Sequence, residues 1–132
     1  MKRCLDSWAV LAWLDGDEPA ADVVERVIKR ERPGMSWINL VEVHYRTIRN
    51  HGRQEADQVL ATLRPLVTES LPGIAAMRSA SSLKAEHPIA LADCFAIALA
   101  AEERAALLTG DPEILDRTGQ LPCKVVDLRA DG

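Results

Sequence analysis

Four acidic residues stand in stretches of the sequence that otherwise carry no charge. Asp93 is the only acidic or basic residue between positions 89 and 101, and Glu42 is the only one between positions 35 and 43. Asp6 is followed by eight uncharged residues, and Asp111 follows the apolar run 105–109 after a single glycine. An ionised carboxylate in apolar surroundings is costly unless it is paired or bound to a cation. The sequence therefore predicts four acids that are paired, protonated or bound to a cation.

These acids are expected to converge at one edge of a parallel sheet. In open α/β sheets, ligands gather beyond the carboxyl ends of the strands. Asp6 ends the first predicted strand and Asp111 follows a later one, whereas Glu42 and Asp93 reach the same edge from helices. Clustered carboxylates raise one another's pKa unless a cation is present. A ligand set made only of oxygens, without His or Cys, favours Mg²⁺ or Mn²⁺ over zinc.

Most of these acids also have a purely structural interpretation. Asp6 can cap the helix that starts at position 7 or 8, and Asp111 can cap a turn that begins at Pro112. Glu42 can pair with Arg46, four residues later on the same helix. Asp93 is the hardest to explain without a ligand, because its helix is apolar nearly all round and is expected to be buried.

The elements that must position these acids alternate between strands and helices. Strands are predicted at 2–6, 35–36, 105–109 and 124–128. Helices are predicted at 8–14, 20–30, 37–50, 53–63, 72–86 and 91–103, with a helical turn at 111–117. Strands separated by helices form parallel sheets that are covered on both faces. The expected fold class is α/β, a three-layer α/β/α sandwich with a small parallel sheet, in a single domain that spans residues 1–132.

The charge of the chain is unevenly distributed. The 132 residues carry a formal net charge of -4, yet the stretch from 26 to 53 holds seven basic and two acidic residues, a net charge of +5. Such a stretch can attract a polyanion, or it can be a solvated helical face. The three cysteines are widely spaced and follow no metal-binding pattern, which indicates buried free thiols. No signal sequence or membrane span is expected, and the predicted location is the cytoplasm.

Four segments of the chain resemble the signature blocks of a known family. Residues 4–14 (CLDSWAVLAWL), 39–43 (NLVEV), 90–100 (ALADCFAIALA) and 107–115 (LLTGDPEIL) are similar to the four acidic blocks of PIN domains, and most similar to those of VapC-type toxins. The resemblance implies a Mg²⁺-dependent endoribonuclease that acts on structured RNA, commonly tRNA or ribosomal RNA. It also implies a homodimer that a small antitoxin protein holds inactive.

The resemblance also implies roles for individual residues. Asp6 and Asp93 are the implied main metal ligands, and Asp111 is a ligand either directly or through water. Glu42 completes the acidic centre, and as a mechanistic hypothesis we expect it to orient or deprotonate the attacking water. Because water is the nucleophile in this hypothesis, the products should carry 5′-phosphate and 3′-hydroxyl ends. The expected catalytic residues and the two hydroxyls beside them are thus Asp6, Glu42, Asp93, Asp111, Ser7 and Thr109.

Substrate binding and the rival functions remain open at this point. Arg46 and Arg49 share a helix face with Glu42 and are candidates for gripping RNA phosphates, although exposed arginines also serve solubility. A receiver-type signalling domain also holds Mg²⁺ in an acidic pocket, but its pattern includes adjacent acids after the first strand, whereas here Asp6 is followed by Ser7. A non-catalytic helical interaction module would leave Asp93 unexplained.

Overall fold

The fold is organised around one parallel sheet. The computed structural model describes residues 2–129. Its five strands are β1 (Arg3–Leu5), β2 (Gly34–Ser36), β3 (Thr68–Ser70), β4 (Ala106–Thr109) and β5 (Lys124–Asp127). Seven helices connect or flank them: α1 (Ser7–Asp15), α2 (Ala20–Arg30), α3 (Trp37–His51), α4 (Arg53–Leu63), α5 (Ile74–Glu86), α6 (Leu91–Glu103) and α7 (Pro112–Leu115). All strand pairs are parallel, in the order β3-β2-β1-β4-β5.

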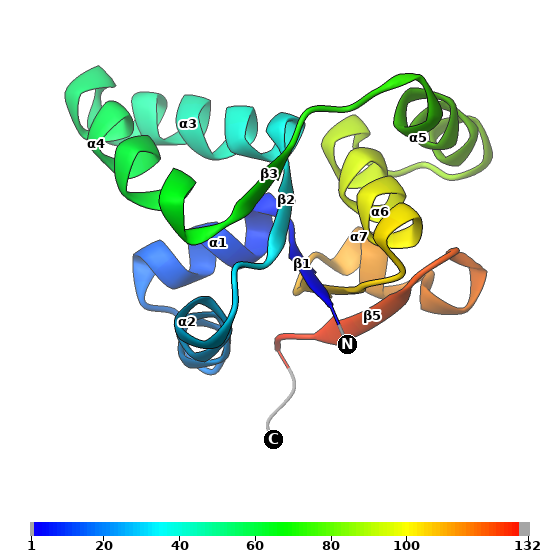
Figure 1. The fold of residues 1–132 in the computed structure, drawn as a ribbon, viewed down its shortest axis with the longest axis horizontal. Helices are drawn as coiled ribbons and strands as arrows, with labels where there is room; N and C mark the ends of the chain where they lie inside the picture. The colour runs from blue at the N-terminus through cyan, green and yellow to red at the C-terminus, as the bar shows by residue number, and fades with distance from the viewer. Residues whose placement is uncertain (1, 130–132) are drawn as a thin grey trace.

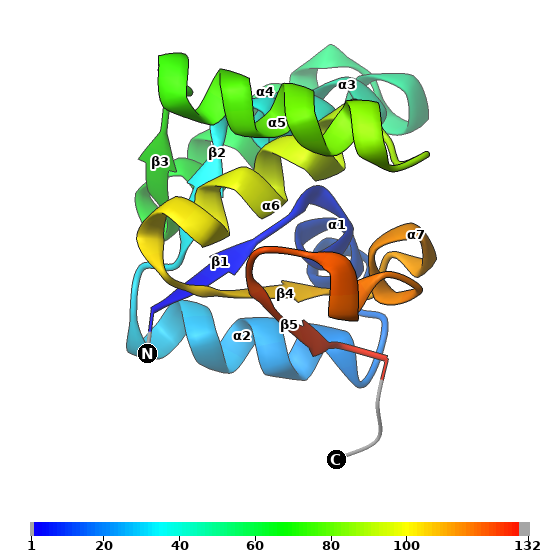
Figure 2. The same ribbon diagram turned by 90° about the vertical axis from the view of Figure 1, so that its right-hand side faces the viewer.

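Helices cover both faces of this sheet, which confirms the predicted three-layer sandwich (Figures 1 and 2). Successive side chains of a strand point to opposite faces. Leu5 and Leu108 accordingly join the core formed with α1–α4. Cys4 and Leu107, their neighbours along the strands, join the core formed with α5, α6 and α7.

The two central strands, β1 and β4, bring Asp6 and Asp111 to one edge of the sheet. Leu5 of β1 is paired in register with Leu108 of β4, so Asp6 and Thr109 leave the two strands side by side. The chain passes from β1 to β2 through α1 and α2, and from β3 to β4 through α5 and α6 on the other face. The strand order therefore reverses between β1 and β4, and such switch points are where ligands bind in open α/β sheets.

Helix α6 carries Asp93 in its first turn and is buried along most of its middle, although Leu91 and the last two residues are exposed. Its buried residues besides Asp93 are Cys94, Ala96, Ile97, Ala98, Leu99 and Ala100. The helix packs on β1, β2 and β4 on one side and on α5 and α3 on the other, so apolar residues are required nearly all round it.

The structure departs from the sequence-based expectations in a few places. Strand β3 was not predicted, because Thr68, Glu69 and Ser70 are polar and show no apolar alternation; it pairs with β2 at the edge of the sheet. Cys4 and Cys94 are buried, but Cys123 is only half-buried, so the expectation of three buried thiols was wrong for Cys123. Within residues 2–129, no helix is both long and apolar enough to cross a membrane.

Candidate metal centre

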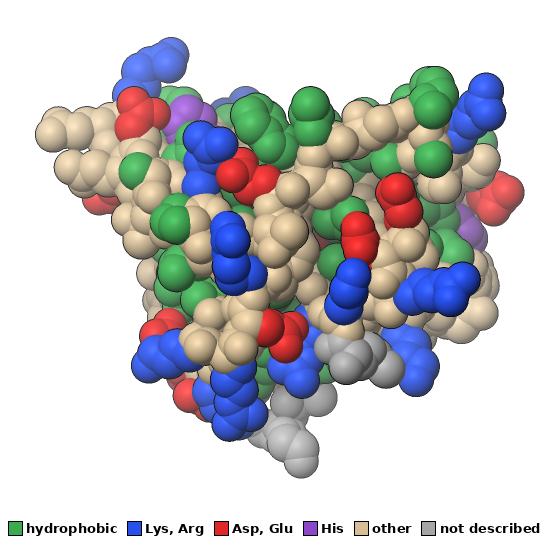
Figure 3. All heavy atoms as spheres, in the orientation of Figure 1, with side chains coloured by type: hydrophobic (Ala, Val, Ile, Leu, Met, Phe, Trp, Pro, Cys, Tyr) green, Lys and Arg blue, Asp and Glu red, His purple; other side chains and the backbone are tan. Residues whose placement is uncertain are grey.

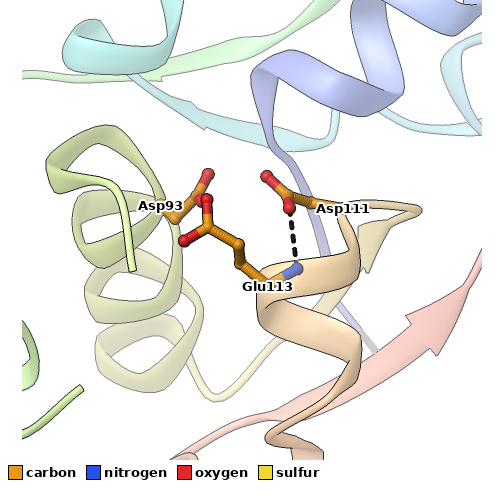
Figure 4. Close-up of side chains that lie close together, drawn as sticks. All are labelled: Asp93, Asp111 and Glu113. Carbon is orange, nitrogen blue, oxygen red and sulfur yellow. Dashed lines mark hydrogen bonds between the residues drawn. The ribbon is translucent and has the colours of Figure 1, made fainter. Parts of the chain in front are cut away.

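Three carboxylates meet at the carboxyl edge of the sheet. Asp93 comes from the first turn of α6, Asp111 from the end of β4, and Glu113 from the first turn of α7. One oxygen of each lies within 4.8 Å of the others, and no other such trio is found within residues 2–129. Figure 4 shows the three side chains pointing toward one another. The first turn of α6 and the segment that follows β4 thus bring three carboxyl groups together.

Asp93 is the most deeply buried member of this trio. Asp93 is only 4% exposed, and its Oδ2 is buried without a hydrogen-bond partner in the described structure. Burial, and then repulsion from Asp111, raise the pKa of Asp93 from 3.8 to about 8. A native protein rarely leaves a buried polar atom unsatisfied, and an ion is one recognised reason.

Asp6 is completely buried and is held by two donors. Its Oδ1 accepts a hydrogen bond from the backbone N–H of Ala9 at 2.8 Å, and the Thr109 hydroxyl donates to its Oδ2. The bond from Thr109 links the end of β4 to the residue that follows β1, and Thr109 also accepts a hydrogen bond of 3.0 Å from the backbone N–H of Asp111. Burial raises the pKa of Asp6 to about 7, although both hydrogen bonds oppose that rise.

Glu42 lies beside the trio and is held by a hydroxyl and a cation. The Ser7 hydroxyl donates to its Oε1, and the Arg46 guanidinium lies 3.4 Å from its Oε2. Repulsion from Glu42 contributes to the raised pKa values of Asp6 and Asp93, so the negative charges act on one another. The predicted hydroxyls, Ser7 and Thr109, therefore both contact acids of the cluster.

The structural interpretations of the single acids are also realised. Asp6 caps α1, Asp111 caps α7 by accepting the backbone N–H of Glu113 at 3.0 Å, and Glu42 forms the expected pair with Arg46. These contacts occupy one oxygen of Asp111, whereas the Oδ2 of Asp93 has no hydrogen-bond partner in the described structure. Capping therefore accounts for part of the arrangement, but it does not account for Asp93.

The donor set fits a hard divalent cation. Every candidate ligand is a carboxylate oxygen, and the buried Oδ2 of Asp93 has no protein partner. Mg²⁺ and Mn²⁺ prefer such oxygens, and a bound cation removes the repulsion that raises the carboxylate pKa values. The structure brings Asp93 and Asp111 together as expected and adds Glu113, which was not predicted. Asp6, which follows β1, and Glu42 are not members of this trio.

A cleft of about 340 Å³ opens beside the acids. Its lining includes Glu42, Asp111, Trp8 and Arg46, but not Arg49. Arg49 instead stacks over the ring of Tyr45, 5.0 Å from its centroid. On the face shown in Figure 3, Lys and Arg side chains are scattered among acidic ones rather than gathered in one stripe. Of the two arginines proposed to bind substrate, only Arg46 lines this cleft.

Two residues of this region escaped the sequence analysis. Glu113 is exposed, and an acid in the first turn of a helix is ordinary, so only its spacing of two residues from Asp111 could have singled it out. Asn39 is 0% exposed and bonds to the helix of Asp93, yet a lone Asn in an apolar stretch gives no signal of a site.

Comparison with known proteins decides the family. The sequence model of the PIN domain family matches residues 3–121, a range that includes every acid described above. The chain belongs to the PIN domain family. The PIN fold also explains why a receiver-type domain is not favoured: receiver domains have the strand order 2-1-3-4-5, whereas this PIN domain has 3-2-1-4-5.

Solved structures of similar fold come from toxin–antitoxin complexes. The PIN domain is similar to a chain of VapBC2 from Rickettsia felis bound to a DNA fragment from its promoter, with 17% identity, a TM-score of 0.74, and 96% and 98% of the two chains covered. It is similar to a chain of VapBC-1 from nontypeable Haemophilus influenzae, with 20% identity, a TM-score of 0.73, and 98% and 100% covered.

A third similar structure is that of DNA-bound VapBC from Salmonella typhimurium, with 16% identity, a TM-score of 0.75, and 97% and 98% of the two chains covered. Among curated protein sequences, none matches this chain. At these identities, the solved structures show a shared fold over nearly the whole length of both chains.

Proposed function

We propose that this PIN domain is a Mg²⁺-dependent endoribonuclease and the toxin of a toxin–antitoxin pair. The observation that carries the proposal is the meeting of Asp93, Asp111 and Glu113 within 4.8 Å at the carboxyl edge of the sheet. If these carboxylates hold Mg²⁺ or Mn²⁺, the ion would supply a lower pKa for water in the site and neutralisation of developing charge on a phosphoryl group. Hydrolysis of a phosphodiester bond needs both effects.

In this proposal, three or four of the acids bind the ion and a further acid acts on the attacking water. Asp6, Asp93 and Asp111 are the proposed ligands, and Glu113 lies close enough to complete the set. Thr109 holds the carboxylate of Asp6 in a fixed orientation through its hydroxyl.

Glu42 is the proposed group that orients and deprotonates the attacking water. Its carboxylate is 17% exposed and lines the cleft, so it reaches a substrate there while Ser7 and Arg46 fix its orientation. A general base must lie within hydrogen-bond reach of the proton that it removes. Water as the nucleophile gives 5′-phosphate and 3′-hydroxyl ends.

The proposed substrate is structured RNA, of the tRNA or ribosomal RNA class, which places the activity in the cytoplasm. Arg46 is half-exposed at the cleft and supplies a positive charge beside the acids. Arg49 is a second candidate farther along α3, where it would contact phosphates away from the cleft. The other basic residues of the 26–53 stretch include Arg26 and Lys29, which pair with acids of their own helix and are less available.

The proposed protein partners are a small antitoxin and a second copy of the chain. Similar folds occur in toxin–antitoxin complexes from Klebsiella pneumoniae and Mycobacterium tuberculosis. Trp37 and Val41 of α3 are 41% and 54% exposed and border an apolar cavity of about 250 Å³, which suits an apolar segment of an antitoxin. Ile74 and Met77 share a face of α5, are 62% and 44% exposed, and suit a homodimer contact.

Cleavage of total bacterial RNA by the purified protein, freed of any antitoxin, tests the proposed function. We expect discrete fragments with Mg²⁺, none with EDTA, and none from an Asp93→Asn variant. Cleavage that survives both EDTA and the substitution would refute the metal mechanism. Labelling of an aspartate by acetyl phosphate, without RNA cleavage, would favour the signalling alternative instead.

A further inference from the structure

Asn39 joins the two helices that carry Glu42 and Asp93. It lies in the first turn of α3, three residues before Glu42, so both side chains share one face of the helix. Its side chain is 0% exposed. Its Nδ2 donates a hydrogen bond of 3.2 Å to the backbone carbonyl of Ala92, the residue that immediately precedes Asp93 in α6. The amide therefore contacts α6 at the point from which Asp93 projects.

The hydrogen bond to Ala92 uses only one end of the Asn39 amide. The Oδ1 of Asn39 is buried without a hydrogen-bond partner, and within residues 2–129 the only other side-chain atom in that condition is Oδ2 of Asp93. A buried unsatisfied acceptor destabilises a protein, whereas an apolar side chain of the same shape would avoid that cost. The two unsatisfied atoms thus lie on α3 and α6, the two helices that the hydrogen bond from Asn39 to Ala92 joins.

We propose that Asn39 is a positioning residue of the metal centre. Its amide holds the first turn of α6 against α3 and thereby sets where the carboxylate of Asp93 lies relative to Glu42. Asn39 acts through Asp93 and does not touch the ion. This inference rests on the proposed function, because it assumes that the acids bind a divalent cation. Residues that fix metal ligands in this way usually change metal affinity by about 10- to 100-fold when they are replaced.

Thr47 provides a matched control on the same helix. It is also buried, at 6% exposure, and its hydroxyl donates a hydrogen bond of 2.8 Å to the backbone carbonyl of Val43 in the preceding turn. That bond lies within α3 and does not involve α6. Thr47→Val removes a buried polar group of α3 with little change in shape, without altering the contact that Asn39 makes.

The experiment is calorimetric titration of Mn²⁺ into the wild-type protein, Asn39→Leu, Asn39→Ser and Thr47→Val, with the urea-unfolding midpoint of each measured in EDTA. We expect both Asn39 variants to bind Mn²⁺ about 10- to 100-fold more weakly than the wild-type protein. We expect Asn39→Leu to keep or raise the unfolding midpoint, and Thr47→Val to bind Mn²⁺ as the wild-type protein does.

The outcomes separate this inference from the function on which it rests. Wild-type affinity in Asn39→Leu or Asn39→Ser would overturn the positioning role while leaving the metal site intact. Failure of both Asn39 variants to fold would also overturn it, since Asn39 would then be a structural residue. A wild-type protein that binds no Mn²⁺ would refute the proposed function itself, and the inference with it.

Discussion

Replacing Asp93 by Asn should stabilise the metal-free protein, and the gain should grow as the pH rises. Burial and repulsion from Asp111 raise the pKa of Asp93 in the folded state to about 8, from the 3.8 that describes the carboxyl in the unfolded chain. Between these two pH values the folded protein keeps a proton that the unfolded chain has lost. The contribution of Asp93 to stability is therefore fully present below about pH 4 and is lost progressively up to about pH 8.

The size of this effect follows from the two pKa values. One pKa unit is worth about 1.4 kcal/mol, so the interval from 3.8 to about 8 sets a ceiling of roughly 5 to 6 kcal/mol at pH 8. Local relaxation and entry of water reduce the cost of a buried charge. We therefore expect Asp93→Asn to raise the free energy of unfolding by about 2 to 4 kcal/mol at pH 8, and by only about 1 kcal/mol at pH 5.

Urea unfolding in EDTA at pH 5 and pH 8 measures this difference. Asp116→Asn is the control, because Asp116 is exposed and no gain is expected from it at either pH. Addition of Mn²⁺ to the wild-type protein at pH 8 should remove most of the deficit relative to Asp93→Asn, since the cation neutralises the cluster. An equal gain at both pH values, or none at pH 8, would show that Asp93 carries no buried charge and would refute the reasoning.

Three further variants probe the surroundings of the cluster. Glu113→Gln should raise the Mn²⁺ dissociation constant about tenfold or more in a calorimetric titration; an unchanged constant would remove Glu113 from the site. Gly110→Ala should lower the free energy of unfolding by about 1 to 3 kcal/mol in urea, because a Cβ there would lie 2.2 Å from the Trp8 ring; unaltered stability would contradict that contact. Changing Arg46 and Arg49 together to Ala should weaken RNA binding and flatten its dependence on salt concentration by a slope of about one to two. An unchanged dependence of RNA binding on salt concentration would show that both arginines are solvated surface residues that do not contact RNA.

Much of the fold could be predicted from the sequence because its central elements are strongly apolar. The run 105–109 predicts the buried strand β4, and the nearly uncharged stretch 91–101 predicts the buried helix α6. Strand β3 could not be predicted, since its three polar residues owe their extended conformation to pairing with β2, which is a property of the assembled sheet. The local sequence pattern therefore failed to predict a strand whose conformation depends on pairing with another strand.

The candidate site shows the same division. Asp93 is conspicuous in the sequence because a single acid interrupts an apolar helix, and the structure places it beside Asp111 as expected. Glu113 and Asn39 give no such signal: one is an exposed acid at a helix start, and the other is a polar residue whose proposed role depends on a contact with Ala92, 53 residues away. Contacts of that kind depend on how α3 and α6 pack, which neither segment encodes alone.

The chemistry of the cleaved ends is the most direct test of the central claim, that carboxylate-bound Mg²⁺ activates water to hydrolyse RNA. Total RNA treated with the wild-type protein or with Asp93→Asn can be ligated to adaptors that require a 5′-phosphate, with and without prior phosphorylation of 5′-hydroxyl ends by a kinase, and then sequenced. We predict discrete sites with 5′-phosphate and 3′-hydroxyl ends that need both Mg²⁺ and Asp93. Ends that carry 2′,3′-cyclic phosphate, formed equally by the Asp93→Asn variant or in EDTA, would contradict it.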